Sequence, residues 1–221
     1  MDYFRTPLQA GRYFHIFNCA NGDEKLFRES ENYKFFLNKY SHHINPIAET
    51  FAYCLMPNHF HFIVRFKELE LINKHFQSPY TITKLNIENT SLILSKQFSN
   101  LFSSYTQALN KKYHRRGNLF KTPFGRIEIT NENYLRRAIC YVHLNPVKHK
   151  IVNSIEDWEF TSFKTYYSNE QSNINRDEVI QLFNDLENMK FVHLNSYDNY
   201  GIEEKSVNYT FSFSSNKVIL G

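Results

Sequence analysis

The stretch from Leu55 to Val64 places two histidines two residues apart in the alternating pattern of a β-strand. Successive side chains of a strand point to opposite faces, so His59 and His61 share one face and Phe60 and Phe62 the other. Two neighbouring imidazoles on a rigid strand form half of a divalent metal site. The alternative is that each is an ordinary hydrogen-bonded surface or core histidine. Coordination to a cation would remove the repulsion that arises if both rings are protonated, and the motif by itself leaves both interpretations open.

The remaining chain predicts the order β-α-β-β-α-β followed by a helix, judged from hydrophobic periodicity and turn residues. This order is typical of an α+β, ferredoxin-like fold, an antiparallel sheet with helices packed on one face. The predicted strands are 13–18, 50–56, 60–66 and 124–130; the predicted helices are 30–43, 91–113 and the one that carries Tyr141.

Polar residues predict where these elements begin and end. Ser30 is expected to cap the first helix, and Asn131 or Asn133 the helix that carries Tyr141. Residues 67–90 are polar and poorly periodic, which predicts an inserted loop.

Domain organisation follows from a change in composition near the C-terminus. We expect one domain over residues 1–167 and an appendage over residues 168–221, with one helix at about 177–189 and a loosely ordered end from residue 195.

Composition limits the class of protein. With 221 residues, of which 42% are hydrophobic, the chain can form one sizeable core plus an appendage. The 21 Phe and 15 Tyr residues favour an aromatic core, although exposed rings could also stack on unpaired bases. The net charge of +4 permits an anionic partner without requiring one. Three cysteines without a C-x-x-C pair, and no secretory or membrane-spanning pattern, predict a soluble cytoplasmic protein with no membrane partner.

A second candidate segment contains Tyr141 and Asn145, whose four-residue spacing puts both side chains on one helix face. A phenol is a poor nucleophile near its ordinary pKa of about 10, but a nearby divalent cation would assist its attack on a phosphate. The amide oxygen of Asn145 would be a suitable third, neutral ligand, and such a ligand set favours Mg²⁺ or Mn²⁺. The alternative is that Asn145 and Pro146 begin a new short helix, with Asn145 as its cap.

Positive charge concentrates between the second helix and the last strand, next to Leu119, Phe120 and Phe124. Such a segment suits a phosphate backbone and unstacked bases, although a solvated helix end with a turn at Gly117 explains it equally well. The candidate DNA-binding residues are Lys111, Lys112, Arg115, Arg116, Lys121 and Arg126.

Taken together, these motifs resemble a known family. The run Met56–Val64 is similar to the HUH motif (His, hydrophobe, His) of single-tyrosine transposases. Residues 116–121, 134–135 and 141–148 resemble the branch called REP-associated tyrosine transposases, and residues 157–162 resemble the segment that closes their domain. The resemblance covers about residues 8–167.

The resemblance implies the ferredoxin-like nuclease fold and metal-dependent cleavage and rejoining of single-stranded DNA through a 5′-phosphotyrosine. It implies Tyr141 as the nucleophile and His59, His61 and Asn145 as ligands of Mg²⁺ or Mn²⁺. The implied partner is single-stranded DNA that contains hairpins, bound by a monomer or a homodimer. The implied location is the prokaryotic cytoplasm, at the nucleoid when the protein is bound to DNA.

Two other classes of protein remain as alternatives. One is a non-catalytic module that binds single-stranded nucleic acid on the same sheet. The set His59, His61, Tyr141 and Asn145 argues against it, because a binding module has no need of all four. The other is an unrelated metal-dependent hydrolase, which would lack the usual acidic or third histidine ligand.

Overall fold

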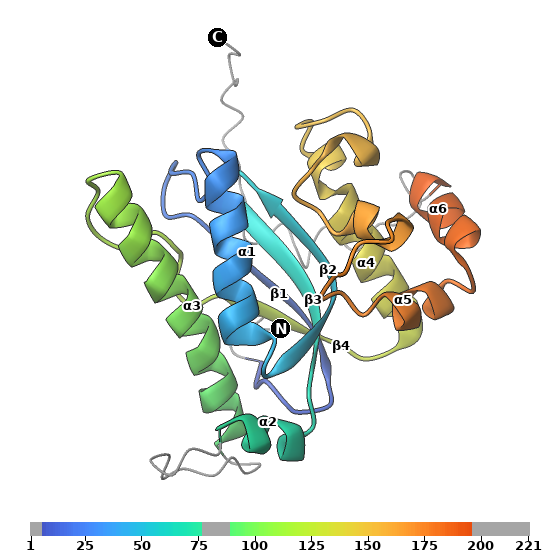
Figure 1. Cartoon of the computed structure of the whole chain (residues 1–221), viewed down its shortest axis with the longest axis horizontal. Coiled ribbons are helices and arrows are strands. Elements are labelled where there is room, and N and C mark those ends of the chain that lie inside the picture. The colour runs from blue at the N-terminus through green and yellow to red at the C-terminus, as the bar shows by residue number, and fades with distance from the viewer. Residues whose placement is uncertain (1–5, 77–88, 196–221) are drawn as a thin grey trace.

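The computed structural model describes residues 6–76 and 89–195 (Figure 1). Within them, one sheet has the strand order β2-β3-β1-β4, and all neighbouring strands are antiparallel. The strands are β1 (Tyr13–Cys19), β2 (Ala48–Met56), β3 (His59–Phe66) and β4 (Gly125–Ile129). This order, with a helix in each of the two crossovers, confirms the ferredoxin-like α+β fold.

Helices cover both faces of the sheet. The helices are α1 (Ser30–Ile44), α2 (Leu69–Phe76), α3 (Thr90–Lys112), α4 (Glu132–Lys148), α5 (Arg176–Leu182) and α6 (Leu186–Asn195). One face carries α1 and α3, as a ferredoxin-like arrangement predicts, and the opposite face also carries a helix, α4, with α5 and α6 beyond it (Figure 1). The sheet is therefore the middle layer, and its second face lies against α4.

Alternate side chains of β3 belong to two different cores, one on each face of the sheet. Phe60 and Phe62 point toward α1, where the ring of Phe62 stacks on Tyr40 with centroids 4.1 Å apart. Ile63 points the other way and packs in the core that contains Ile139 of α4. Burial of an aromatic or aliphatic side chain of this size stabilises the fold by about 1.5–3 kcal/mol. The pattern that puts the phenylalanines in one core leaves the histidines facing α4.

The prediction that residues 67–90 form an inserted loop is wrong for the first half of this segment. Residues 69–76 form α2, and Ile72 is fully buried in the core shared with α3. A helix of eight residues with one buried side chain is too short for hydrophobic periodicity to reveal. Residues 77–88 lie outside the described residues, so the loop predicted there is not tested.

Of the two predicted helix caps, the one for α4 is confirmed and the one for α1 is wrong. The side chain of Asn131 accepts a hydrogen bond of 2.9 Å from the backbone N–H of Tyr134, so Asn131 and not Asn133 caps α4. Ser30 is the first helical residue of α1, and the capping position belongs to Glu29. The prediction of Ser30 as a cap is therefore wrong by one residue.

The helix α4 continues through Asn145 and Pro146 to Lys148. The interpretation of Asn145 as the cap of a new short helix is therefore wrong. Proline removes one backbone donor from the helix, but the backbone N–H of His149 still bonds the carbonyl of Asn145 at 2.9 Å. Asn145 thus keeps its helical position one turn after Tyr141.

The helix predicted at 177–189 is interrupted. It divides into α5 and α6 at Asn184, which adopts a left-handed conformation with φ of 71°. Phe183 and Met189 on either side are buried in the core that also contains α4 residues. The predicted helix therefore becomes two short helices, because the turn lets both bury apolar side chains. The loosely ordered end that the sequence predicts falls on 196–221, outside the described residues.

A buried polar chain connects α6, α4 and β2. Nδ1 of His143 lies 2.9 Å from Nε2 of His193, and Nε2 of His143 lies 2.8 Å from the hydroxyl of Ser162. The same hydroxyl accepts a 2.9 Å hydrogen bond from the backbone of Tyr53. Residues beyond 167 therefore contact the helix that carries Tyr141, and the domain boundary placed there stays a prediction.

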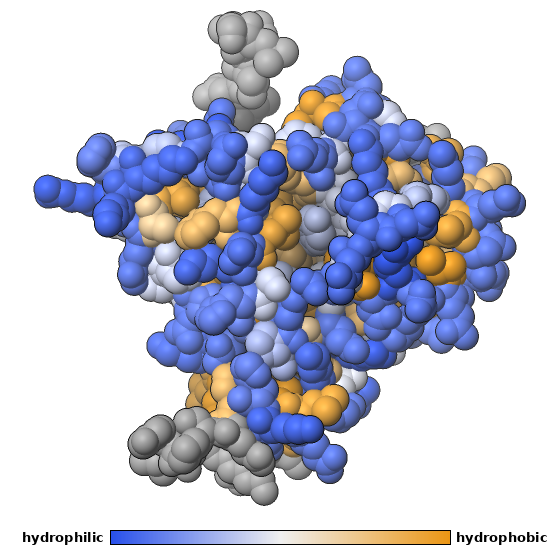
Figure 2. All heavy atoms as spheres, viewed as in Figure 1, coloured by the Kyte–Doolittle hydropathy of each residue, from blue (hydrophilic) through white to orange (hydrophobic). Residues whose placement is uncertain are grey.

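The surface is mainly hydrophilic on the face drawn in Figure 2, with apolar side chains over α6. In α6, Phe191 and Leu194 are 64% and 56% exposed. No helix in the described parts of the chain combines the length and apolarity needed to span a bilayer. Cys19, Cys54 and Cys140 are buried and free, which agrees with the absence of paired spacing.

Candidate active site

The candidate site lies on the face of the sheet that α4 covers. Strand β3 contributes His59 and His61, which are 2% and 1% exposed. Strand β1 contributes His15 and Phe17 to the same face, because Phe17 is paired with His61 in the antiparallel register. Two central strands therefore bring three histidines together beneath one helix.

Each predicted metal-ligating histidine uses its Nδ1 in a short contact within the protein. Nδ1 of His59 lies 2.7 Å from the side-chain oxygen of Asn58, and Nδ1 of His61 lies 2.9 Å from Nε2 of His15. Metal-ligating histidines commonly engage one ring nitrogen in this way, which orients the other toward the metal. Coordination by either ring would therefore use Nε2.

The helix α4 places Tyr141 and Asn145 over these rings. The ring of Tyr141 lies edge-on to His61 and His15, with centroid separations of 5.6 and 6.0 Å. The amide nitrogen of Asn145 donates a 3.0 Å bond to the carbonyl of Tyr141. Its side-chain oxygen is buried with no hydrogen-bond partner in the described protein. A buried acceptor without a partner is costly, and a ligand would satisfy it.

Burial keeps the groups of the site neutral. Burial lowers the pKa of His59 to about 3, with a smaller contribution from the nearby His149, and lowers the pKa of His61 well below its ordinary value. Neutral imidazole is the form that binds metals. Burial also raises the pKa of Tyr141 to about 12, opposed by a hydrogen bond with Asn145, so the phenol keeps its proton at neutral pH.

The donor set of the site fits a divalent cation that accepts nitrogen and oxygen ligands. In the described parts of the chain, no three His, Cys, Asp or Glu side chains are grouped as a metal centre would need. A centre built on His59 and His61 would therefore need another kind of donor, and the unpartnered oxygen of Asn145 is one. Two imidazoles, one amide oxygen and water are suited to Mg²⁺ or Mn²⁺ more than to structural zinc.

Several residues of this site escape sequence reasoning. The ring of His149 lies 5.1 Å from that of His59, and the ammonium of Lys148 lies 5.0 Å above the ring of Tyr141. His15 and Phe17 stand two residues apart in the strand and therefore share one face, which is the only sequence signal for His15. Only the strand register shows that these side chains meet.

Phe17 depends on a glycine in the neighbouring strand. Its ring lies 6.0 Å from that of His61 and 5.1 Å from that of His15. A Cβ atom at Gly125 of β4 would lie 2.2 Å from the Phe17 ring. The glycine therefore provides the space for the aromatic ring that packs beside His61.

The basic segment lies at the same end of the sheet as His59. The backbone N–H of Lys121 bonds the carbonyl of Cys19 at 2.9 Å, and Cys19 is paired with His59. Two strand spacings correspond to about 10 Å. The backbone of Lys121 therefore lies about 10 Å from that of His59.

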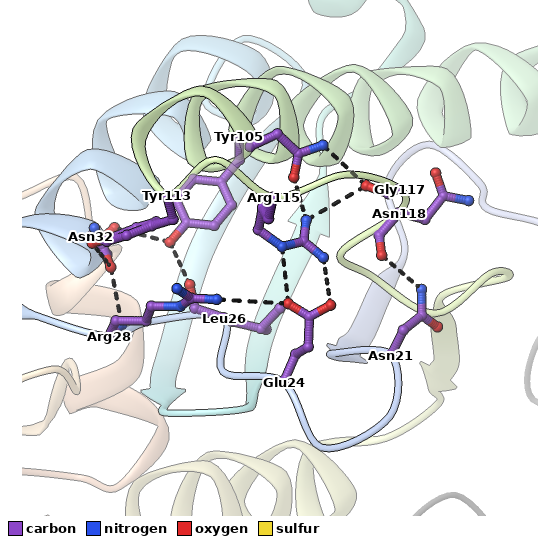
Figure 3. Close-up of polar contacts among 11 residues, drawn as sticks. Asn21, Glu24, Leu26, Arg28, Asn32, Tyr105, Tyr113, Arg115, Gly117 and Asn118 are labelled. Carbon is purple, nitrogen blue, oxygen red and sulfur yellow. Dashed lines mark hydrogen bonds and ion pairs between the residues drawn. The ribbon is translucent and has the colours of Figure 1, made fainter.

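Two of the candidate basic residues are occupied within the protein. The side chain of Arg115 is only 9% exposed, and its guanidinium contacts both carboxylate oxygens of Glu24 (Figure 3) and the side chain of Asn110. Lys112 forms an ion pair with Glu29. These contacts hold the segment against the rest of the fold. Both side chains already face a carboxylate, and their contact with DNA stays a prediction.

The other candidates line or border a groove between α3 and residues 117–126. Lys111, Arg116 and Lys121 are exposed. Arg126 stacks on Phe124 at 4.6 Å and bonds the hydroxyl of Ser95 at 2.7 Å. The groove has a volume of about 570 Å³; α3 contributes hydroxyl and amide side chains to its lining, and residues 117–126 contribute apolar side chains together with Lys121 and Arg126. Such groups, with nearby cations, commonly contact phosphates and sugars.

Comparison with known proteins agrees with the motifs. No protein-family model matches the chain. A curated protein of Haemophilus influenzae, named as a REP-associated tyrosine transposase, is 25% identical over 120 residues, 52% of this chain and 58% of that protein. This chain thus matches little more than half the length of its relative. A solved REP-associated tyrosine transposase bound to a REP hairpin has a TM-score of 0.56 at 20% identity, over 76% of this chain and 86% of that one, and shares the fold.

Proposed function

This chain is a relative of the REP-associated tyrosine transposases, and we propose that it cuts and rejoins single-stranded DNA through a tyrosine nucleophile. The observation that carries the proposal is the position of Tyr141. Its ring lies 5.6 Å from that of His61, and one helical turn later Asn145 places an unpartnered buried oxygen on the same helix. A helix that only packed on the sheet would have no reason to bury that oxygen.

The proposed reaction is a transesterification at Tyr141. The phenol oxygen forms a bond to phosphorus, and the bond from phosphorus to the 3′-oxygen of the preceding nucleotide breaks. The phenol proton is released, and the departing oxygen takes up a proton to become a free 3′-hydroxyl. Attack by a 3′-hydroxyl on the phosphotyrosine reverses the exchange, and the stored phosphodiester means that rejoining needs no ATP.

His59, His61 and Asn145 are the residues that would hold Mg²⁺ or Mn²⁺. Bound there, the cation would polarise the scissile phosphate and offset the charge that develops on it. The protein would contribute orientation: Asn58 and His15 hold the two imidazoles, and α4 holds the phenol above them. Burial of the phenol would keep Tyr141 protonated until a phosphate arrives.

We propose hairpin-containing single-stranded DNA as the substrate. Exposed Lys111, Arg116 and Lys121 would contact its phosphates, beside the groove that α3 lines with hydroxyl groups. The relative whose structure is solved was bound to a REP hairpin, which supports a hairpin as the first substrate to test.

The experiment is a denaturing-gel assay for a covalent adduct. The protein would be incubated with labelled single-stranded hairpins from the flanks of its own gene, with Mn²⁺, with Mg²⁺ or with chelator. Tyr141→Phe removes the proposed nucleophile, and Tyr134→Phe, on the same helix, is the matched control. We expect an adduct that requires metal and Tyr141 and is kept by the control. Tight hairpin binding with no adduct would instead identify a binding module.

A further inference from the structure

A hydrogen bond between two fully buried histidines joins β1 to the proposed metal site. Nε2 of His15 lies 2.9 Å from Nδ1 of His61, and the two side chains are 4% and 1% exposed. His15 pairs across the ladder with Ile63, so it meets His61 diagonally on the same face. A contact of this length between two ring nitrogens needs one proton between them.

The position of that proton decides which nitrogen of His61 can bind a cation. A neutral imidazole carries one proton, so a lone pair at Nε2 requires the proton at Nδ1. Nδ1 of His61 then donates, and Nε2 of His15 must accept. In the opposite arrangement His15 donates, His61 carries its proton at Nε2, and that nitrogen has no lone pair for a metal.

His59, two residues before His61 on β3, also has a partner at Nδ1, and that partner can only accept a hydrogen bond. Nδ1 of His59 lies 2.7 Å from Oδ1 of Asn58, an amide oxygen, so His59 must carry its proton at Nδ1. Both rings on β3 therefore have an acceptor placed at Nδ1. One acceptor is next to its histidine in sequence, and the other comes from a different strand.

We propose that His15 is a positioning residue that holds His61 in the Nδ1–H tautomer and thereby directs the Nε2 lone pair of His61 to the metal. The role in metal binding rests on the proposed function, whereas the tautomer is a property of the metal-free protein. The buried ring of Phe17 and the partly buried ring of Tyr141 surround this pair and limit the access of water that could otherwise replace the acceptor. Phenylalanine at position 15 would fill similar space but would leave Nδ1 of His61 without a partner.

The test is two-bond ¹H–¹⁵N NMR of the metal-free, DNA-free protein, which reports the protonated nitrogen of each histidine. We expect His61 to be protonated at Nδ1 in the unmodified protein. His15→Gln, whose amide oxygen can reach a similar position and accept, should keep that tautomer. His15→Leu should lose it or give a mixture. Protonation of His61 at Nε2 in the unmodified protein would overturn the proposal, even if no variant folds.

Metal affinity is the second readout, measured by Mn²⁺ titration followed by electron paramagnetic resonance. Loss of an orienting partner commonly weakens metal binding by about 10–100-fold, and we expect this for His15→Leu but not for His15→Gln. Equal affinity in both variants would reduce His15 to a packing residue. The Nδ1–H tautomer together with an absence of any DNA adduct would leave the inferred tautomer standing and count against the proposed nuclease.

Discussion

The ring of Tyr141 on α4 lies edge-on to the ring of His61 on β3, with centroids 5.6 Å apart and an interplanar angle of 83°. These residues are eighty positions apart in sequence and belong to adjacent layers of the fold, the sheet and the helix that covers it. The contact unites the two motifs that the sequence marks separately. It also places the proposed nucleophile beside a proposed ligand, as tyrosine attack on a metal-bound phosphate requires.

Removing either histidine of β3 should abolish cleavage. We expect His59→Ala and His61→Ala each to lose metal-dependent adduct formation at low Mn²⁺, because one imidazole and one amide oxygen bind such a cation weakly. The exposed His42 offers a control, His42→Ala, which should behave like the unmodified protein. Full activity of either β3 variant at low Mn²⁺ would contradict the ligand assignment.

Asn145 should affect metal binding more than stability. Asn145→Leu removes an oxygen that has no partner to lose, together with one hydrogen bond to the Tyr141 carbonyl, worth about 1 kcal/mol. In the unmodified protein, Mn²⁺ at one hundred times its dissociation constant should stabilise the fold by about 2.7 kcal/mol. Thermal unfolding with and without Mn²⁺ measures both effects. A metal-induced rise in Tm that persists in Asn145→Leu would exclude this residue as a ligand.

Gly125→Ala should destabilise the protein through Phe17. The added Cβ would lie 2.2 Å from the buried ring, and such overpacking typically costs about 1–3 kcal/mol. Because Phe17 packs beside His61, Mn²⁺ affinity should fall as well. Urea denaturation gives the stability change. The double variant Gly125→Ala/Phe17→Leu should recover part of it, and no recovery would show that the ring is not the cause.

Two adjacent arginines should behave in opposite ways. Arg115→Ala breaks the contacts with Glu24 and Asn110, so we expect a stability loss of about 1–3 kcal/mol. Arg116→Ala should leave stability unchanged, weaken hairpin binding and lower the magnitude of the salt slope by about 1. Denaturation and binding at several salt concentrations separate the two roles. Equal effects of both variants on DNA binding alone would contradict the structural role of Arg115.

The buried pair His143 and His193 should make the fold sensitive to acid. Burial lowers the pKa of His193 to about 4 and that of His143 well below its ordinary 6.5. The unfolded chain therefore takes up protons first, so stability is full above about pH 6.5 and falls as pH drops toward 4. By pH 5 the loss from His193 is roughly 2 kcal/mol.

Urea denaturation between pH 7.5 and pH 5 tests this acid sensitivity, with His193→Gln as the comparison. The variant isolates the pair from the other buried histidines, because those are present in both proteins. Its free energy of unfolding should fall less steeply with acid than that of the unmodified protein. Identical slopes would show that His193 does not titrate in this window.

Short-range patterns account for the parts of the fold that the sequence predicts correctly. Three such patterns are the period-two alternation around His59, the apolar stripe of α3 and the cap at Asn131. Each depends on residues that are only a few positions apart in sequence. The interruption at Asn184 and the burial of Ile72 in α2 were missed, because both depend on packing against distant elements.

For the site, the sequence alone indicated the chemistry of its central residues: two imidazoles on one strand face, and a phenol and an amide on one helix face. Local periodicity determines which side chains share a face, so this needed no knowledge of the fold. Only the tertiary structure decided that these faces meet, that His15 reaches His61, and that Arg115 is held by Glu24. Those contacts depend on strand order, register and ion pairing between segments far apart in the chain, which no local pattern records.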